Sequence, residues 1–137
     1  MASLDDLRQA ILTAVAHLNS GGVLLVAAKT EETFQNNNFA YTGEKDGVHV
    51  TLFENNYINP FHPNTYEATL IYLIREHGAL TIHTENQVLG LFSQAAWDQV
   101  FKDAGIEMKR STLNGVYDKF ILNDGEYPLT VYVGRKV

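Results

Sequence analysis

The sequence contains no cysteine among its 137 residues. It therefore has no means of forming a disulfide framework, a thiolate metal site or a cysteine nucleophile. Basic residues are also scarce, because 10 Lys and Arg stand against 16 Asp and Glu, which gives a net charge of -6 at pH 7. A general attraction to nucleic acid or to anionic lipid is therefore not expected, and a basic partner or a cationic, amine-bearing ligand suits this charge better.

Long hydrophobic runs are missing as well. No apolar stretch reaches the length of a membrane-spanning helix, and the first residues carry Asp5, Asp6 and Arg8 instead of the basic start and apolar core of a signal peptide. We therefore expect no membrane contact and a cytoplasmic location. The composition, 45% hydrophobic and 19% charged, is that of a folded globular protein. The length suits one domain better than two, so residues 1–137 are predicted to form a single domain.

Helical spacing of apolar residues predicts two main helices. Ser3 and Asp6 resemble a capping box ahead of such a pattern, which predicts a helix over residues 4–18. Ser93 is the expected N-cap of the second helix, and Gly105 lies just beyond its expected end.

Several other segments are typical of β-strands. Val23–Ala28 is an uninterrupted apolar run, which suits a strand buried on both faces in a parallel sheet covered by helices. Residues 47–54, 66–76 and 80–89 are rich in β-branched and aromatic side chains, which predicts an antiparallel meander with His77-Gly78 as its last turn. Further short strands are expected at 106–109, 120–122 and 129–133, the last two on either side of the Asn123–Glu126 turn.

The order of these pieces resembles the second half of class I S-adenosylmethionine-dependent methyltransferases. The residues that carry the resemblance are Asn19-Ser20-Gly21-Gly22-Val23-Leu24-Leu25-Val26, Gly90-Leu91-Phe92-Ser93, Ala104-Gly105-Ile106 and Val131-Tyr132-Val133-Gly134-Arg135. The chain is most similar to the small-molecule N-methyltransferase branch, which includes sugar-amine N,N-dimethyltransferases with an antiparallel lid over the acceptor. The resemblance covers nearly the whole chain. It implies an α/β fold, with a partial Rossmann-like sheet of the last three core strands, two main helices and an antiparallel lid at residues 39–90.

The resemblance also implies something about the cofactor. In that family, a glycine-rich loop after the first strand and an acidic residue that ends the second strand hold the cofactor, and both precede the part that this chain resembles. Gly21 and Gly22 come before a strand rather than a helix, so they do not match that loop. We therefore expect no cofactor to be bound by this chain alone, and S-adenosylmethionine to be bound only if a first half is supplied separately.

The same resemblance predicts an exposed edge on the Val23–Ala28 strand, because the strand that neighbours it in the family is absent. An uncharged, apolar strand edge promotes aggregation unless another chain pairs with it or covers it. We therefore expect either a homodimer in which two such surfaces meet, or a separate chain that supplies the N-terminal half.

Two functions follow from these expectations. The first is a truncated, methyltransferase-like protein that is inactive alone and transfers methyl groups to a small-molecule amine with a complementary chain. The second is a non-catalytic dimeric module for ligand binding or protein interaction. Nothing in the sequence supports a hydrolase, a kinase or a nucleic-acid-binding protein, because the motifs of those classes are missing.

Candidate substrate-binding residues lie in the predicted lid. Aromatic faces can contact a cationic amine, and a histidine or glutamate can take up a released proton. The alternative is that these side chains are ordinary core and surface residues. No metal site is expected, because His83 and Glu85 are too few ligands to fill a metal shell. The substrate-binding candidates are Tyr57, His62, Tyr66, His83 and Glu85.

Overall fold

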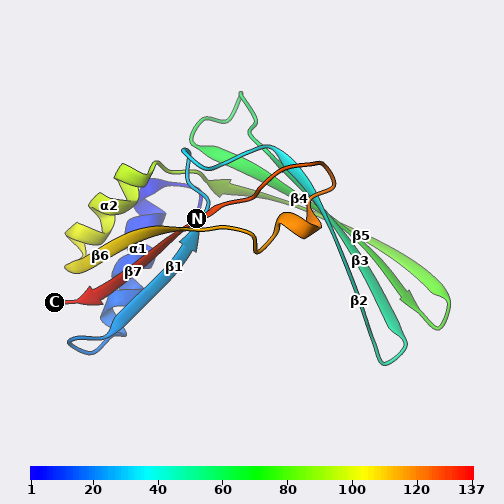
Figure 1. Cartoon of the computed structure of the whole chain (residues 1–137), viewed down its shortest axis with the longest axis horizontal. Helices are drawn as coiled ribbons and strands as arrows, with labels where there is room; N and C mark the ends of the chain where they lie inside the picture. Colours follow the sequence, from blue (N-terminus) through cyan, green and yellow to red (C-terminus); the bar gives the residue numbers. More distant parts are fainter. The chain divides into compact units, whose positions relative to one another are not determined.

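The computed structural model describes all 137 residues as two α-helices, seven β-strands and one short 3-10 helix. The chain divides into two compact units, each with its own sheet (Figure 1). Unit 1 consists of Met1–Phe34, Gly90–Asn114 and Pro128–Val137, and unit 2 of Gln35–Leu89 and Gly115–Tyr127. Unit 2 contains most of the predicted lid, and the assignment of the whole chain to a single domain stays a prediction.

Helix α1, Leu4–Ala16, begins at the predicted capping box. The Ser3 hydroxyl accepts a hydrogen bond from the Asp6 backbone N–H at 3.1 Å, and the Asp6 carboxylate accepts one from the Ser3 N–H at 3.1 Å. These bonds satisfy N–H groups that have no partner inside the helix. The predicted helix is therefore confirmed, with its start set by the cap.

Helix α2, Gln94–Asp103, is also confirmed. The Ser93 hydroxyl caps it by accepting a hydrogen bond from the Ala96 N–H at 3.2 Å. Gly105 follows its end with φ +72°, a left-handed conformation that glycine adopts without strain. Neither helix is long and apolar enough to cross a membrane.

The sheet of unit 1 has three antiparallel strands in the order β1-β7-β6. They are β1 (Val23–Ala28), β6 (Ile106–Leu113) and β7 (Leu129–Lys136). They confirm the three predicted core strands. The hairpin expected between 120–122 and 129–133 is wrong, because β1 and β6 already occupy both edges of β7. The residues expected to form its first strand lie instead in and just after the 3-10 helix η1, Asp118–Phe120.

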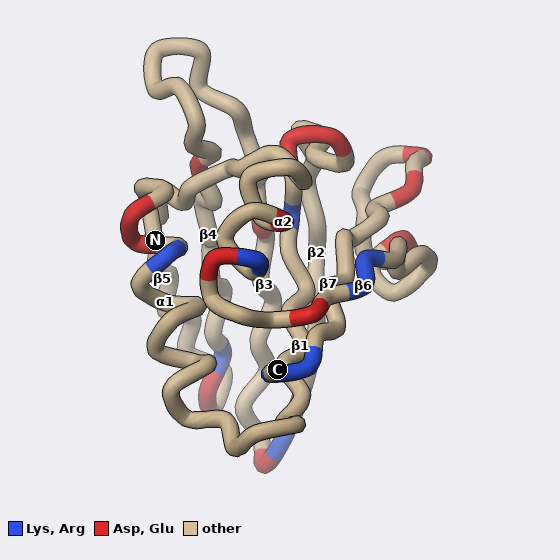
Figure 2. Tube along the Cα trace, turned by 90° about the vertical axis from the view of Figure 1, so that its left-hand side faces the viewer, with Lys and Arg blue, Asp and Glu red and all other residues tan.

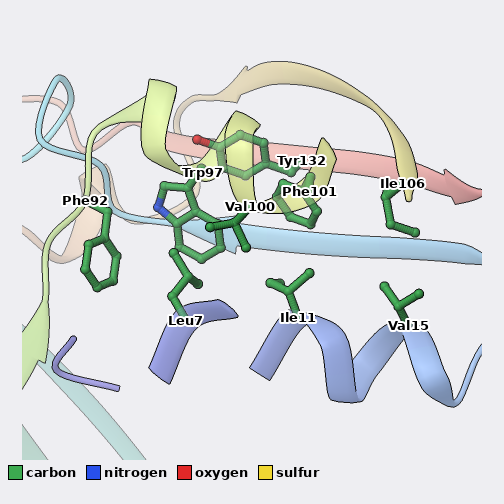
Figure 3. Close-up of a cluster of buried hydrophobic side chains, with 9 residues drawn as sticks. All are labelled: Leu7, Ile11, Val15, Phe92, Trp97, Val100, Phe101, Ile106 and Tyr132. Carbon is green, nitrogen blue, oxygen red and sulfur yellow. The ribbon is translucent and has the colours of Figure 1, made fainter. Parts of the chain in front are cut away.

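Both helices pack on one face of this sheet, and their apolar side chains form the core of unit 1 (Figure 3). Tyr132 of β7 is fully buried there, and its ring stacks on Trp97 of α2 at a centroid distance of 5.4 Å. The buried cluster consists of Leu7, Ile11, Val15, Phe92, Trp97, Val100, Phe101, Ile106 and Tyr132.

The prediction that Val23–Ala28 is buried on both faces is wrong for this chain. Leu24 and Val26 pack against the core, whereas Val23 and Leu25 are 61% and 65% exposed. The reason is that α1 and α2 contribute to one core on one face, so the alternate side chains of β1 have no cover. The strand also pairs with β7 alone, and antiparallel, which makes it an edge strand rather than a parallel interior strand.

The sheet of unit 2 has four strands in the order β2-β3-β4-β5. Their bounds are Asn37–Lys45 for β2, Val48–Tyr57 for β3, Thr65–Glu76 for β4 and Ala79–Gly90 for β5. This arrangement confirms the antiparallel meander. His77 and Gly78 form its last turn, which confirms the predicted turn. Their φ values are 49° and 80°. The sequence pattern missed β2, because its Asn37-Asn38 start and its Gly43-Glu44-Lys45 end are poor in strand-forming residues.

Candidate functional site

Polar side chains gather on one face of the unit 2 sheet. Side chains alternate between the two faces of a strand, so Glu54 and Asn56 of β3 lie on the same face. Asn37 of β2 lies directly opposite Asn56 in the strand register, and Tyr41, four residues further along β2, lies on the same face. We call Asn37, Tyr41, Glu54 and Asn56 the polar track.

The Glu54 carboxylate lies at the centre of the polar track. One of its oxygens, Oε1, accepts a hydrogen bond from the Asn56 side-chain amide at 2.8 Å. The other oxygen, Oε2, accepts a hydrogen bond from the Tyr41 hydroxyl at 3.2 Å. Hydrogen bonds to an ionised carboxylate are stronger than those between neutral groups. These two contacts therefore fix the orientation of the carboxylate over the sheet.

The tyrosines near Glu54 are held in their neutral form. Burial, with a smaller contribution from the negative charge of Glu54, raises the pKa of Tyr66 to about 12. Burial, followed by the Glu54 charge and its hydrogen bond, raises the pKa of Tyr41 still further. The pKa of Tyr127 is also raised, first by burial and then by its acidic and tyrosine neighbours. These phenols therefore serve as hydrogen-bond donors near neutral pH and not as bases.

The second segment of unit 2, Gly115–Tyr127, contacts the same face of the sheet. The Tyr127 ring meets Phe39 edge-on at 4.9 Å, and the Phe120 ring lies 4.9 Å from Tyr41. The backbone N–H of Leu122 donates to the Asn38 carbonyl at 3.0 Å. The segment therefore partly covers the polar track, through ring contacts and little regular strand pairing.

Asn37 is the unusual member of the polar track. Its side chain is only 9% exposed, yet neither its amide nitrogen nor its amide oxygen has a hydrogen-bond partner. A buried polar group without a partner costs about 1–3 kcal/mol. Such groups are rare in folded proteins, so Asn37 is an energetically costly residue on this face of the sheet.

The predicted site residues are divided between the two faces of the unit 2 sheet. Tyr66 of β4 is buried on the face of the polar track. The Thr69 hydroxyl donates to the Asn86 side chain at 3.0 Å on the other face, so by alternation His83 and Glu85 of β5 share the face of Tyr66. Both are exposed.

The remaining two candidates lie away from the polar track. Tyr57 pairs with Glu67 on the opposite face of the sheet and is 43% exposed. His62 lies in the connection between β3 and β4, where its Nδ1 is 3.6 Å from the Glu67 carboxylate. The structure thus brings Tyr66, His83 and Glu85 to one face and leaves Tyr57 and His62 apart, and the substrate-binding role of all five stays a prediction.

The sequence interpretation missed the polar track itself. A signal was present, because Asn36-Asn37-Asn38 and Glu54-Asn55-Asn56 place polar residues inside or beside strand-forming segments. Only the strand register shows which of them face one another. The distribution of charge does not point to a site either, since the Lys and Arg residues are scattered along the trace (Figure 2). Nor do three or more histidine, aspartate or glutamate side chains meet as potential metal ligands.

Comparison with solved structures finds the same fold in methyltransferases. DesVI of Streptomyces venezuelae matches 98% of this chain with a TM-score of 0.74 and 20% identity. The amino pentose methyltransferase CalS10 of Micromonospora echinaspora, solved with S-adenosylmethionine bound, matches all of it with a TM-score of 0.69 and 16% identity. The sugar N-methyltransferase KedS8 of Streptoalloteichus matches 98% with a TM-score of 0.69 and 19% identity.

The chain spans about half the length of these proteins, namely 52% of DesVI, 53% of CalS10 and 50% of KedS8. No family model matches the chain, and no curated protein matches it. The structural likeness confirms the predicted fold, that of the carboxy-terminal half of a class I methyltransferase. At this level of identity the likeness concerns the fold and carries no activity with it.

Proposed function

We propose that this chain is the acceptor-binding half of a split methyltransferase. In this proposal it is inactive alone, and a complementary chain supplies the cofactor-binding half for methyl transfer to a small-molecule amine. The observation that carries the proposal is that nearly the whole chain has the fold of about half of CalS10, an amino pentose methyltransferase, and of KedS8, a sugar N-methyltransferase.

The loop before β1 supports placing the cofactor outside residues 1–137. Gly21, with φ +75°, and Gly22 make the turn between α1 and β1. They lead into a strand and not into a helix N-terminus, and a Cβ on Gly22 would come within 2.9 Å of the Asn19 carbonyl oxygen. The glycines therefore serve a tight backbone turn, and the residues present do not fit the glycine-rich nucleotide loop of the resembled family.

The polar track supports the acceptor role. A small-molecule amine that receives a methyl group must be oriented, and it must lose a proton to a base. Near Glu54, the raised pKa values of Tyr41 and Tyr66 leave these side chains as donors. The Glu54 carboxylate is then the group in the track that can attract an ammonium or accept its proton.

The proposal is tested by calorimetry with S-adenosylhomocysteine and by transfer of radiolabelled methyl groups. The chain alone is expected to show neither binding nor transfer. The chain mixed with the product of the reading frame that precedes it in the genome is expected to show both. Tight binding by the isolated chain would contradict the proposal, as would a mixture that binds and transfers no better than the added protein alone.

A non-catalytic dimeric module is the second candidate. The observation that favours it is the uncovered β1, whose Val23 and Leu25 side chains are exposed on an uncharged edge strand. Such an edge is suited to pairing with another polypeptide. This function is supported if the chain forms a stable dimer that binds small ligands. It also requires that the product of the preceding reading frame restores no methyl transfer.

A further inference from the structure

The unit 1 sheet has one face that neither helix covers. Side chains alternate along a strand, and Leu24 and Val26 pack against the core, so Val23 and Leu25 of β1 point to the opposite face. The strand register shows which residues of β7 and β6 lie beside them on that face. We call this surface the open face, and it consists of Val23, Leu25, Glu107, Lys109, Val133 and Arg135.

The open face is apolar along β1 and charged along β6. Its β1 side chains are well exposed, at 61% for Val23 and 65% for Leu25. Glu107 lies opposite Arg135 in the register, so these two charges offset one another. Lys109, in contrast, lies opposite a valine of β7. The apolar strip therefore has a positively charged flank at Lys109, although the chain as a whole carries a net charge of -6.

The dimensions of the open face match those of a single α-helix. Two strand spacings of about 4.8 Å separate β1 from β6, and a helix with its side chains is about 10–12 Å across. The six residues of β1 and the eight of β7 extend about 20 and 27 Å, which is the length of a helix of about 13–18 residues. A hollow of about 370 Å³, lined mainly by residues of the open face, gives such a helix a place to insert side chains.

The distribution of charge favours a helix over a second sheet on this surface. A packed sheet would cover all three strands and bury Glu107 and Lys109, and burying a charge without a partner is costly. An amphipathic helix has an apolar stripe about 100° wide between polar flanks. It therefore covers the apolar strip and leaves Lys109 at its margin, where a carboxylate of the helix can pair with the ammonium group.

We propose that the open face binds one amphipathic α-helix of another polypeptide, with its apolar stripe on Val23, Leu25 and Val133 and an acidic side chain beside Lys109. The inference rests on the proposed function, because the complementary chain is the source of this helix. A helix on the face leaves the backbone edge of β1 open, so the complementary chain can contact both the edge and the face.

The test is a titration of the isotopically labelled full chain with synthetic peptides, followed by amide NMR spectra. The probe is an 18-residue peptide of alanine, leucine, glutamine and glutamate, with leucines at helical spacing and glutamates along one flank. The matched control peptide has the same composition with leucines at every second position, so its helix has no apolar stripe.

We expect the probe peptide to cause saturable shifts in β1, β6 and β7. Because one helix buries less than the roughly 800 Å² per partner of a standard interface, its Kd is expected to be on the order of 100 μM. The control peptide is expected to bind about tenfold more weakly or less. No saturable shift up to about 1 mM, equal binding of the two peptides, or shifts confined to unit 2 would overturn the proposal.

An exchange of charge tests the position of the acidic flank. Lys109→Glu is expected to weaken binding of the probe by about threefold and to favour a peptide with lysines in place of the glutamates. Lys45→Glu, at the end of β2 in unit 2, makes the same change of charge outside unit 1 and is the control. A Lys109→Glu variant that keeps the preference of the wild type would overturn the assignment.

A second pair of variants tests the apolar strip. Leu25→Ser is expected to fold, because Leu25 is 65% exposed, and to bind the probe about tenfold more weakly. Leu12→Ser, at a 50% exposed position on α1, is the control and is expected to bind as the wild type does. Unchanged binding by Leu25→Ser would contradict the proposal.

The remaining outcomes separate this inference from its alternatives. If the chain dimerises through Leu25 and the probe does not lower the apparent mass in ultracentrifugation, the occupant is a second copy and the proposal is overturned. The titration contains no methyl donor, so peptide binding without restored methyl transfer would contradict the split methyltransferase and leave the helix site standing. Restored transfer that Leu25→Ser and Lys109→Glu leave unchanged, without peptide binding, would do the reverse.

Discussion

Tyr66 shows how one buried side chain ties stability to pH. Its pKa is raised from the ordinary 10 to about 12, mainly by burial. The folded chain therefore holds the phenol proton at pH values where the unfolded chain releases it. The contribution of the Tyr66 proton to the free energy of unfolding is fully present below pH 10. It is lost as the pH rises from 10 towards 12.

The Tyr66→Phe variant is expected to lose less stability than the wild type over that pH interval, since it has no phenol to ionise. Urea denaturation at pH 9, 10, 11 and 12 measures the difference. Absorbance titration of the wild type is expected to show part of its seven tyrosines ionising late. If all seven ionise together near pH 10, the burial of Tyr66 is not as described.

Gly134 of β7 gives a second prediction at the scale of a residue. A Cβ at this position would overlap the Cγ2 atom of Ile106, which is 5% exposed in the core of unit 1. Gly134→Ala is therefore expected to destabilise the protein by about 1–3 kcal/mol, because packed cores tolerate added atoms poorly. Gly43→Ala in β2 is the control, since nothing lies within 4 Å of a Cβ there. Equal effects of the two variants on thermal unfolding would contradict this packing.

At the scale of the element, the start of α1 depends on its cap. Ser3→Ala removes the acceptor for the Asp6 N–H and is expected to cost about 1 kcal/mol of stability in urea denaturation. Ser20→Ala, in the exposed turn beyond α1, is expected to have little effect. A Ser3→Ala variant as stable as the wild type would mean that the capping box does not contribute.

The elements also show what sequence patterns capture. Both helices, the β1 strand and the turn at His77-Gly78 were predictable, because caps, apolar spacing and turn residues act over a few neighbouring positions. The missed strand β2 and the wrong strand at 120–122 have a different cause. Whether a short, weakly patterned segment becomes a strand depends on a free partner edge, which is a long-range property.

At the scale of the whole molecule, the uncovered β1 leads to a prediction about assembly. Val23 and Leu25 are exposed on an edge strand that carries no charge. Without a complementary chain, we expect this surface to bind a second copy of the protein. In analytical ultracentrifugation the wild type is then expected to show an apparent mass that exceeds the monomer mass and rises with protein concentration.

Leu25→Lys is expected to reduce this association, because a charged side chain protects a strand edge. Leu80→Lys, at a 48% exposed position on β5 of the other sheet, is the control and is expected to leave the association unchanged. A wild type that stays monomeric at high concentration, with no other protein present, would contradict a role for β1 in self-association. The homodimer and the separate half-chain both stay predictions.

The amino-acid sequence by itself determined the helices, their caps, most of the strands and, through the order of these elements, the methyltransferase half-fold. Those features depend on local periodicity and on side chains a few residues apart. Only the tertiary structure decided that β7 lies between β1 and β6, that one face of β1 is uncovered, and that Asn37 lies opposite Asn56, which bonds Glu54. These outcomes come from pairing between distant segments, where a shift of one residue moves every side chain to the other face.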